Sequence, residues 1–183
     1  MVPAEKITER MAQLEPVAMR LEVKEGKNGC VLINDSYNSD FASLDIALDF
    51  MARRTEDKGR RRTLILSDIL ESGQPSKLLY RQVADLVHSR KVDRIIGVGE
   101  EISAAASRFE IDKRFFRTTT ELIESGILSS LRNEVVLIKG ARVFHFDDIT
   151  DLLELKIQSL VTVSSDKSES AYEHWLDNGA FNI

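Results

Sequence analysis

Short apolar segments alternate with longer segments of helical periodicity along most of this chain. Continuous apolar runs at Cys30–Ile33, Leu64–Leu66 and Val135–Ile138 are typical of strands that are covered on both faces. Arg94–Val98 and Arg114–Phe116 have the composition of two further strands. Amphipathic helices are predicted over residues 4–14, 40–53, 76–87, 101–109, 119–131 and 147–157. This alternation predicts a mostly parallel sheet, because a crossover helix carries the chain back between parallel strands.

The first two predicted strands form a hairpin instead of a parallel pair. Met19–Lys24 alternates apolar and polar residues, and Glu-Gly-Lys-Asn-Gly over residues 25–29 is a strong turn signal before Cys30–Ile33. The predicted fold class is therefore α/β: a doubly wound, mostly parallel, Rossmann-like sheet with an antiparallel edge hairpin and helices on both faces. We expect this domain to span residues 1–157, and residues 158–183 to form a flexible tail or a junction segment.

The composition fits one ordinary soluble domain. The chain has 183 residues, of which 43% are hydrophobic, and its formal net charge is −5. This charge argues against nucleic acid or a membrane surface as a partner. The apolar runs are far shorter than the ~20 residues that cross a bilayer, so the cytoplasm is the expected compartment. The single cysteine, Cys30, excludes an internal disulfide.

Polar residues follow four of the predicted strands, at the edge of the sheet where such folds bind their ligands. The segments concerned are Asn34–Asn38, Ser67–Asp68, Gly97–Glu100 and Lys139–Arg142. Asp35 and Asp68 could hold a ribose or a magnesium ion, and Asp68 could equally cap the following turn. Lys139 and Arg142, on either side of Gly140, suit a carboxylate or a phosphate, with a pair of solvated charges as the alternative.

Several common signatures of catalysis are absent from the sequence. No G-x-x-x-x-G-K-[ST] segment is present to hold a triphosphate. The Gly97-Val98-Gly99 segment lacks the third glycine of a dinucleotide site and predicts a tight turn between a strand and a helix. The histidines lack the spacing of metal ligands, and no serine lies in a nucleophile elbow. The residues alone therefore predict an α/β domain with a site for an anionic ligand.

Three strings at these strand ends resemble the third domain of Mur ligases, most closely the branch that adds D-alanyl-D-alanine to a UDP-muramoyl tripeptide. Residues 32–39 (Leu-Ile-Asn-Asp-Ser-Tyr-Asn-Ser) are similar to an opening that usually ends in Asn-Ala-Asn-Pro. Residues 67–73 resemble Gly-Asp-Met-x-Glu-Leu-Gly, and residues 137–142 resemble Leu-x-Lys-Gly-Ser-Arg. The chain departs from these patterns at Asp40-Phe41, where Asn-Pro is usual, at Ser67, where glycine is usual, and at Ala141, where serine is usual.

The resemblance implies part of an ATP-dependent amide ligase, in which a substrate carboxylate becomes an acyl phosphate that an amine then attacks. It implies that Arg20 and Asp35 contact the ribose and phosphates of ATP. It also implies that Ser36, Tyr37 and Asn38 line the reacting crevice on the nucleotide side. Closure of this domain over the others would shield the reactive acyl phosphate from water.

The resemblance further implies that Lys139, Gly140 and Arg142 hold the carboxylate of the incoming dipeptide. ATP and its Mg²⁺ would be bound mainly by the amino-terminal and central ligase domains, which this chain lacks, so the isolated chain is expected to be inactive. The implied substrates are a UDP-muramoyl peptide and D-alanyl-D-alanine. Residues 155–157 (Leu-Lys-Ile) resemble the junction of a ligase fused to an alanine racemase, which adds a fused racemase as an expected partner.

Two other classes of function stay open at the level of sequence. A free-standing phosphotransfer or receiver-like domain would use Asp35 and Asp68 around a magnesium ion. A non-catalytic interaction module would instead use the aromatic residues of the carboxy-terminal segment, among them Trp175.

Overall fold

The computed structural model describes residues 21–55, 59–70 and 72–156. The helix predicted over residues 4–14, the candidate nucleotide ligand Arg20 and the segment 158–183 lie outside these ranges. No helix within the described ranges has the length and apolar character that crossing a membrane requires.

The described residues form one sheet of six strands in the order β1-β2-β6-β3-β4-β5. β1 and β2 are antiparallel, whereas every other neighbouring pair is parallel, which confirms the predicted fold class. The strands are β1 (Glu22–Glu25), β2 (Val31–Asp35), β3 (Arg61–Ser67), β4 (Arg94–Val98), β5 (Asp112–Phe116) and β6 (Glu134–Lys139).

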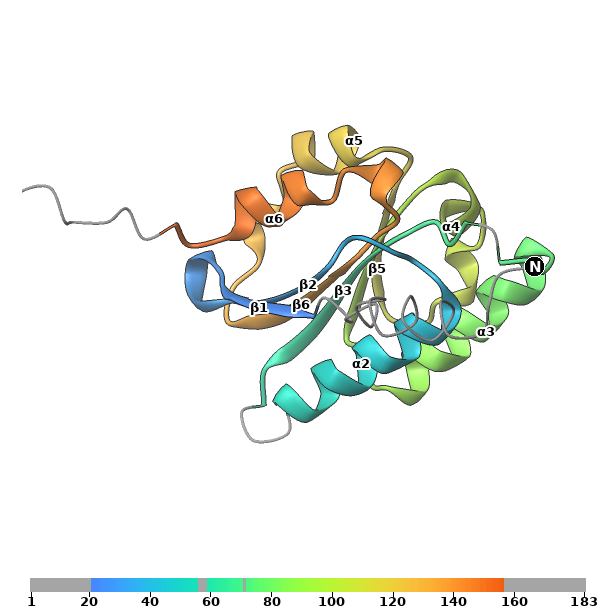
Figure 1. The fold of residues 1–183 in the computed structure, drawn as a ribbon, viewed down its shortest axis with the longest axis horizontal. Coiled ribbons are helices and arrows are strands. Elements are labelled where there is room, and N and C mark those ends of the chain that lie inside the picture. Colours follow the sequence, from blue (N-terminus) through green and yellow to red (C-terminus); the bar gives the residue numbers. More distant parts are fainter. Residues whose placement is uncertain (1–20, 56–58, 71, 157–183) are drawn as a thin grey trace, which may run out of the picture.

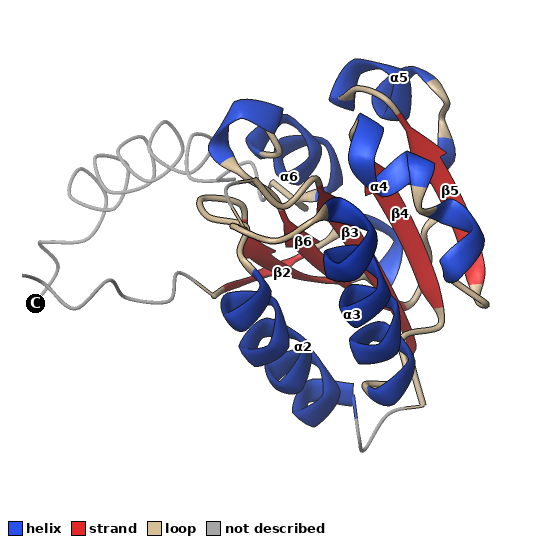
Figure 2. Cartoon of the chain, turned by 90° about the vertical axis from the view of Figure 1, so that its right-hand side faces the viewer, coloured by secondary structure: helices blue, strands red, loops and turns tan. Residues whose placement is uncertain are grey.

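Helices cover both faces of this sheet (Figure 1). One face packs against α2 (Phe41–Thr55), α3 (Ser76–Ser89) and α4 (Glu100–Ala104), and Figure 2 shows α2 and α3 side by side. The other face packs against α5 (Thr119–Glu124) and α6 (Asp147–Leu153). Alternate residues of a central strand therefore enter different cores. In β6, Val135 and Leu137 enter the first core, whereas Val136 and Ile138 enter the second.

Three helices are shorter than the sequence predicts, each for a local reason. The helix expected over residues 101–109 is α4 followed by a 3-10 turn at Ala106–Arg108. The helix expected over residues 119–131 ends before Gly126, which has a φ of 72° in the left-handed region, and a second 3-10 turn follows at Ile127–Ser130. The last helix ends at Leu153 because Glu154 forms an antiparallel bridge with Gly26 of the hairpin.

The starts of three helices differ in how their first N–H groups are capped. Asp40 caps α2, because its carboxylate accepts the Ser43 N–H at 2.9 Å. α5 is capped by the hydroxyl of Thr118, which accepts the Glu121 N–H. α3 begins at Ser76 itself, and Pro75 occupies the capping position without a side-chain hydrogen bond.

Candidate functional site

The strand register brings the four predicted segments together at the carboxyl edge of the sheet. Asp35 at the end of β2 pairs with Lys139 at the end of β6. On the other side of β6, Lys139 pairs with Leu66, and the next residue of β3, Ser67, pairs with Val98 of β4. Segments that are about a hundred residues apart in the chain therefore meet, as ligand-binding sites of open parallel sheets require.

Lys139 and Asp35 form a direct ion pair at this edge. The Nζ of Lys139 donates to Oδ2 of Asp35 at 2.7 Å and to the carbonyl oxygen of Asn38 at 2.7 Å. The Lys139 side chain is 0% exposed and that of Asp35 is 13% exposed. The resemblance assigned these two residues to different ligands, so their mutual contact is a feature that the sequence did not reveal.

A cleft of about 720 Å³ lies beside this ion pair. It is lined by Glu22, Asn34, Ser36, Tyr37, Arg142 and Asp147. Arg142 is exposed, and its guanidinium forms no hydrogen bond or ion pair with any other side chain in the ranges that the structure describes. The cleft therefore presents a cation that is available to an anionic group of a ligand.

Three residues of this cleft were given no individual role from the sequence. Asp147, the first residue of α6, accepts a hydrogen bond from the Ser36 hydroxyl at 2.9 Å, which ties the β2–α2 loop to α6. Asn34 accepts one from Thr150 at 3.4 Å, and Glu22 lies on the neighbouring edge strand. Asn34 stood within a predicted ligand segment and Asp147 at a predicted helix start, but only the fold brings them together.

Asp40 is the last residue of the loop that connects Asp35, at the end of β2, to α2. Burial raises the pKa of Asp40, but the hydroxyl and backbone N–H of Ser43 and the nearby charge of Lys139 outweigh burial and hold the pKa below its ordinary value. The carboxylate is therefore kept ionised while it caps α2.

Asp68 has a structural role instead of a role as a ligand. Its carboxylate accepts the N–H groups of Glu101 and Ile102 in the first turn of α4, at 3.2 and 2.8 Å, and the Tyr80 hydroxyl at 3.2 Å. A Cβ on Gly99 would lie 2.2 Å from this carboxylate, which explains the glycine at the predicted tight turn. With Asp68 buried and occupied in this way, the geometry argues against the phosphotransfer alternative, which needs Asp68 on a magnesium ion.

The Tyr80 phenol belongs to the same buried group. Burial raises the pKa of Tyr80 well above its ordinary value, and the negative charge of Asp68 raises it further, against the effect of the Ile69 N–H. The phenol is therefore a permanent hydrogen-bond donor to Asp68 at physiological pH.

A hydrogen bond to Ser67 and a close approach to Phe146 hold the Lys139–Arg142 segment in place. The Ala141 N–H donates to the hydroxyl of the fully buried Ser67 at 2.9 Å. A Cβ on Gly140 would lie 2.4 Å from the ring of Phe146, so this glycine allows an aromatic side chain to approach the backbone. Gly140 was predicted to let the backbone approach a ligand, and the structure gives the glycine this packing role.

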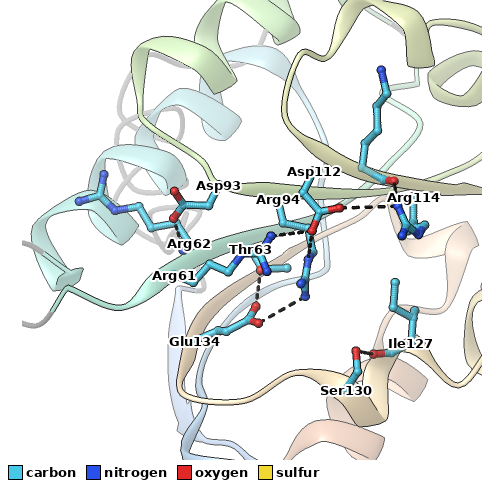
Figure 3. Close-up of polar contacts among 11 residues, drawn as sticks. Arg61, Arg62, Thr63, Asp93, Arg94, Asp112, Arg114, Ile127, Ser130 and Glu134 are labelled. Carbon is cyan, nitrogen blue, oxygen red and sulfur yellow. Dashed lines mark hydrogen bonds and ion pairs between the residues drawn. The ribbon is translucent and has the colours of Figure 1, made fainter.

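Charges at the opposite edge of the sheet are largely neutralised. Figure 3 shows Arg61, Arg94, Asp112 and Glu134, the first residues of four strands, joined by ion pairs, with Thr63 also bonded to Glu134. The hydrogen bond from Arg94 and that from Arg61 outweigh burial and hold the pKa of Asp112 below its ordinary value. These arginines are occupied by carboxylates, unlike Arg142.

Among the described residues, we looked for groups that could bind a metal ion or part of a nucleotide. Within the ranges of the chain that are placed, no group of three or more His, Cys, Asp or Glu residues could hold a metal ion. Tyr37, which is 54% exposed, and the exposed Asn38 follow the end of β2, and an aromatic ring and an amide are groups that suit a base or a ribose.

The fold is that of a doubly wound α/β domain with a cleft at the carboxyl edge of its sheet. The chain belongs to the Mur ligase family, because the family's glutamate ligase domain matches residues 19–142.

Two relatives of this chain are ligases that carry the same name. The chain is 24% identical over 159 residues to the UDP-N-acetylmuramoyl-tripeptide–D-alanyl-D-alanine ligase of Bacillus subtilis, covering 84% of this chain and 34% of that protein. The Escherichia coli ligase of the same name is 25% identical and covers 79% of this chain and 31% of its own length. The chain therefore spans about a third of the relatives that it matches.

Solved structures confirm the shared fold. A MurF structure from Acinetobacter baumannii superposes with a TM-score of 0.59 at 24% identity, covering 82% of this chain and 34% of that chain. A MurF ligase from Thermotoga maritima in complex with ADP gives a TM-score of 0.57 at 18% identity, covering 77% and 31%.

Proposed function

We propose that this chain acts as the carboxy-terminal domain of an ATP-dependent ligase that adds D-alanyl-D-alanine to a UDP-muramoyl tripeptide in peptidoglycan synthesis. The names of the Bacillus subtilis and Escherichia coli relatives support this specificity. The observation that carries the proposal is the cleft at the carboxyl edge, which exposed Arg142 lines together with Ser36 and Tyr37.

The dipeptide carboxylate is the proposed ligand of Arg142. A planar guanidinium binds both oxygens of a carboxylate at once, which fixes the orientation of the dipeptide as well as its position. Because amide formation consumes the amine at the other end of the dipeptide, anchoring the carboxylate directs the amine toward the activated substrate.

The nucleotide is proposed to bind mainly to the amino-terminal and central domains, which lie outside this chain. ATP with Mg²⁺ supplies the phosphoryl group that activates the carboxylate of the UDP-muramoyl peptide. From this chain, Tyr37 and Asn38 line the nucleotide side of the crevice, and Arg20 and Asp35 are the residues proposed to reach the ribose and phosphates. Closure of the edge over the central domain excludes water from the acyl phosphate.

The proposed substrate also bears on the cellular compartment of the protein. UDP-linked peptides are charged and water-soluble, which supports the cytoplasm as the compartment. A fused alanine racemase stays a prediction from residues 155–157, since the matched family and the relatives named above are ligases.

A chimeric ligase tests the proposed function. Residues 19–156 replace the corresponding domain of the Bacillus subtilis relative, and formation of the amide bond with D-alanyl-D-alanine is measured. We expect Arg142→Ala to raise the KM for the dipeptide at least about tenfold, through loss of a charge-assisted contact. Arg132→Ala is the matched control, because Arg132 is an exposed arginine before β6, at the opposite edge. A folded chimera that joins no dipeptide, or equal effects of the two substitutions, would contradict the proposal.

A further inference from the structure

We propose that Lys139 is a positioning residue that holds the loop after β2, and that it does not itself bind the substrate carboxylate. The kinetic part of this inference rests on the proposed function, whereas its structural part rests on contacts within the chain. It separates two basic residues that the resemblance assigned to one task.

One ammonium group joins the end of β6 to both sides of a short turn. Lys139 bonds to the side chain of Asp35 at the end of β2 and to the main-chain carbonyl of Asn38, both at 2.7 Å. The two residues between these acceptors are Ser36 and Tyr37, which line the cleft. Lys139 therefore fixes the turn that presents Ser36 and Tyr37 to a ligand.

Burial argues against direct contact between Lys139 and a substrate. The Lys139 side chain is 0% exposed, whereas Arg142, three residues later, is exposed in the cleft. An ammonium that is removed from water needs strong partners, and drawing it toward a substrate would break two short bonds. The partner carboxylate of Asp35 would then be left buried without its counter-charge.

The charges around Lys139 strengthen this arrangement. Asp40, at the far end of the same loop, is kept ionised by Ser43 and by the charge of Lys139. Lys139 thus lies close to two carboxylates of one loop, which attract it inward, toward the loop. Arg142, which lines the cleft and is exposed, is the cation that the cleft offers to a ligand.

Backbone dynamics of the intact 183-residue chain test the structural part. In Lys139→Met we expect the order parameters of residues 36–39 to fall from about 0.85 to below about 0.6, because the turn loses both anchors. Lys113→Met is the matched control: Lys113 also donates to two carbonyls, of Ala106 and Phe109, but at the opposite side of the sheet. Rigid residues 36–39 in folded Lys139→Met would overturn the proposal. If that variant does not fold, Asp35→Asn combined with Lys139→Met removes both buried charges and must loosen the same residues.

Substrate discrimination in the chimeric ligase tests the kinetic part. We compare kcat/KM for D-alanyl-D-alanine and for its carboxyl-amidated form, which lacks the negative charge. Lys139→Met should lower kcat for both and keep their ratio, whereas Arg142→Ala should reduce that ratio about tenfold or more. A Lys139→Met enzyme that loses the ratio would overturn the proposal. Absence of any ligation in the parent chimera would count against the proposed function alone, and the order parameters would still decide the role of Lys139.

Discussion

At the carboxyl edge, the hydrogen-bond partners of each charged side chain determine whether that side chain is available to bind a ligand. Asp68 is occupied by the first turn of α4 and by Tyr80, and Lys139 is occupied by Asp35 and Asn38. Arg142 has no such partner within the described ranges. The three residues look equivalent as charges after strands, yet only Arg142 is placed to exchange water for a ligand.

Replacement of Asp68 should destabilise the fold. Asp68→Ala removes two capping bonds and leaves the buried Tyr80 hydroxyl without its acceptor, so we expect a loss of about 2 kcal/mol in the free energy of unfolding. Urea denaturation measures this loss, with Asp85→Ala as the control, since Asp85 is exposed on α3. Equal stability of the two variants would show that the capping bonds contribute nothing.

Ser39 offers a substitution in the opposite direction. Its hydroxyl is buried and has no hydrogen-bond partner among the described residues. The family pattern quoted above has alanine at this position. We expect Ser39→Ala to raise the free energy of unfolding by about 1 kcal/mol, because an unsatisfied buried hydroxyl is removed. Ser43→Ala should lower it, since that hydroxyl bonds to Asp40, and a thermal melt of both variants would reveal the contrast.

At the scale of elements, helix α2 has a start that depends on ionisation. The folded-state pKa of Asp40 lies below its ordinary value, so its contribution to stability is complete above the unfolded pKa of about 3.9 and is lost as the pH falls through the folded pKa. Asp40→Asn keeps a capping side chain but removes this titration. The stability advantage of the parent chain over Asp40→Asn should therefore shrink below about pH 3.9. A constant difference from pH 7 to acid, by urea denaturation, would contradict this origin.

The order of strands and helices could be predicted from the sequence because burial on both faces leaves continuous apolar runs such as Val135–Ile138. Helix ends were predicted less well. Gly126 ends α5 through its left-handed backbone, a signal that was present in the sequence, whereas Glu154 ends α6 through pairing with the distant Gly26, a contact that no local pattern carries.

In the candidate site, too, the position of a residue along its strand could be predicted from the sequence, whereas its contacts with distant segments could not. The strand-end rule placed the segments around Asp35 and Lys139 at the same edge of the sheet, and the structure shows that they are neighbours there. It could not distinguish a buried ion pair from a pair of ligand-binding groups, because both patterns place the same residues after the same strands. Burial of Lys139 and exposure of Arg142 depend on how the β2–α2 loop folds over β6.

At the scale of the whole molecule, the two edges of the sheet have different characters. The amino edge is held by ion pairs among Arg61, Arg94, Asp112 and Glu134. The carboxyl edge carries the cleft and the exposed side chains of Tyr37 and Arg142. Because the chain spans about a third of the relatives that it matches, we expect this carboxyl edge to face the proposed central domain.

The most direct test of the account is a titration of the isotope-labelled chain with magnesium-ADP, followed through its amide chemical shifts. We expect shifts centred on Asp35, Tyr37 and Asn38, which are lost in Tyr37→Ala. Tyr37 is the variant of choice, because replacing Asp35 would leave the buried Lys139 without its counter-charge. Shifts centred on Asp68, or confined to the amino edge around Asp112, would contradict the claim that the carboxyl edge is the functional site.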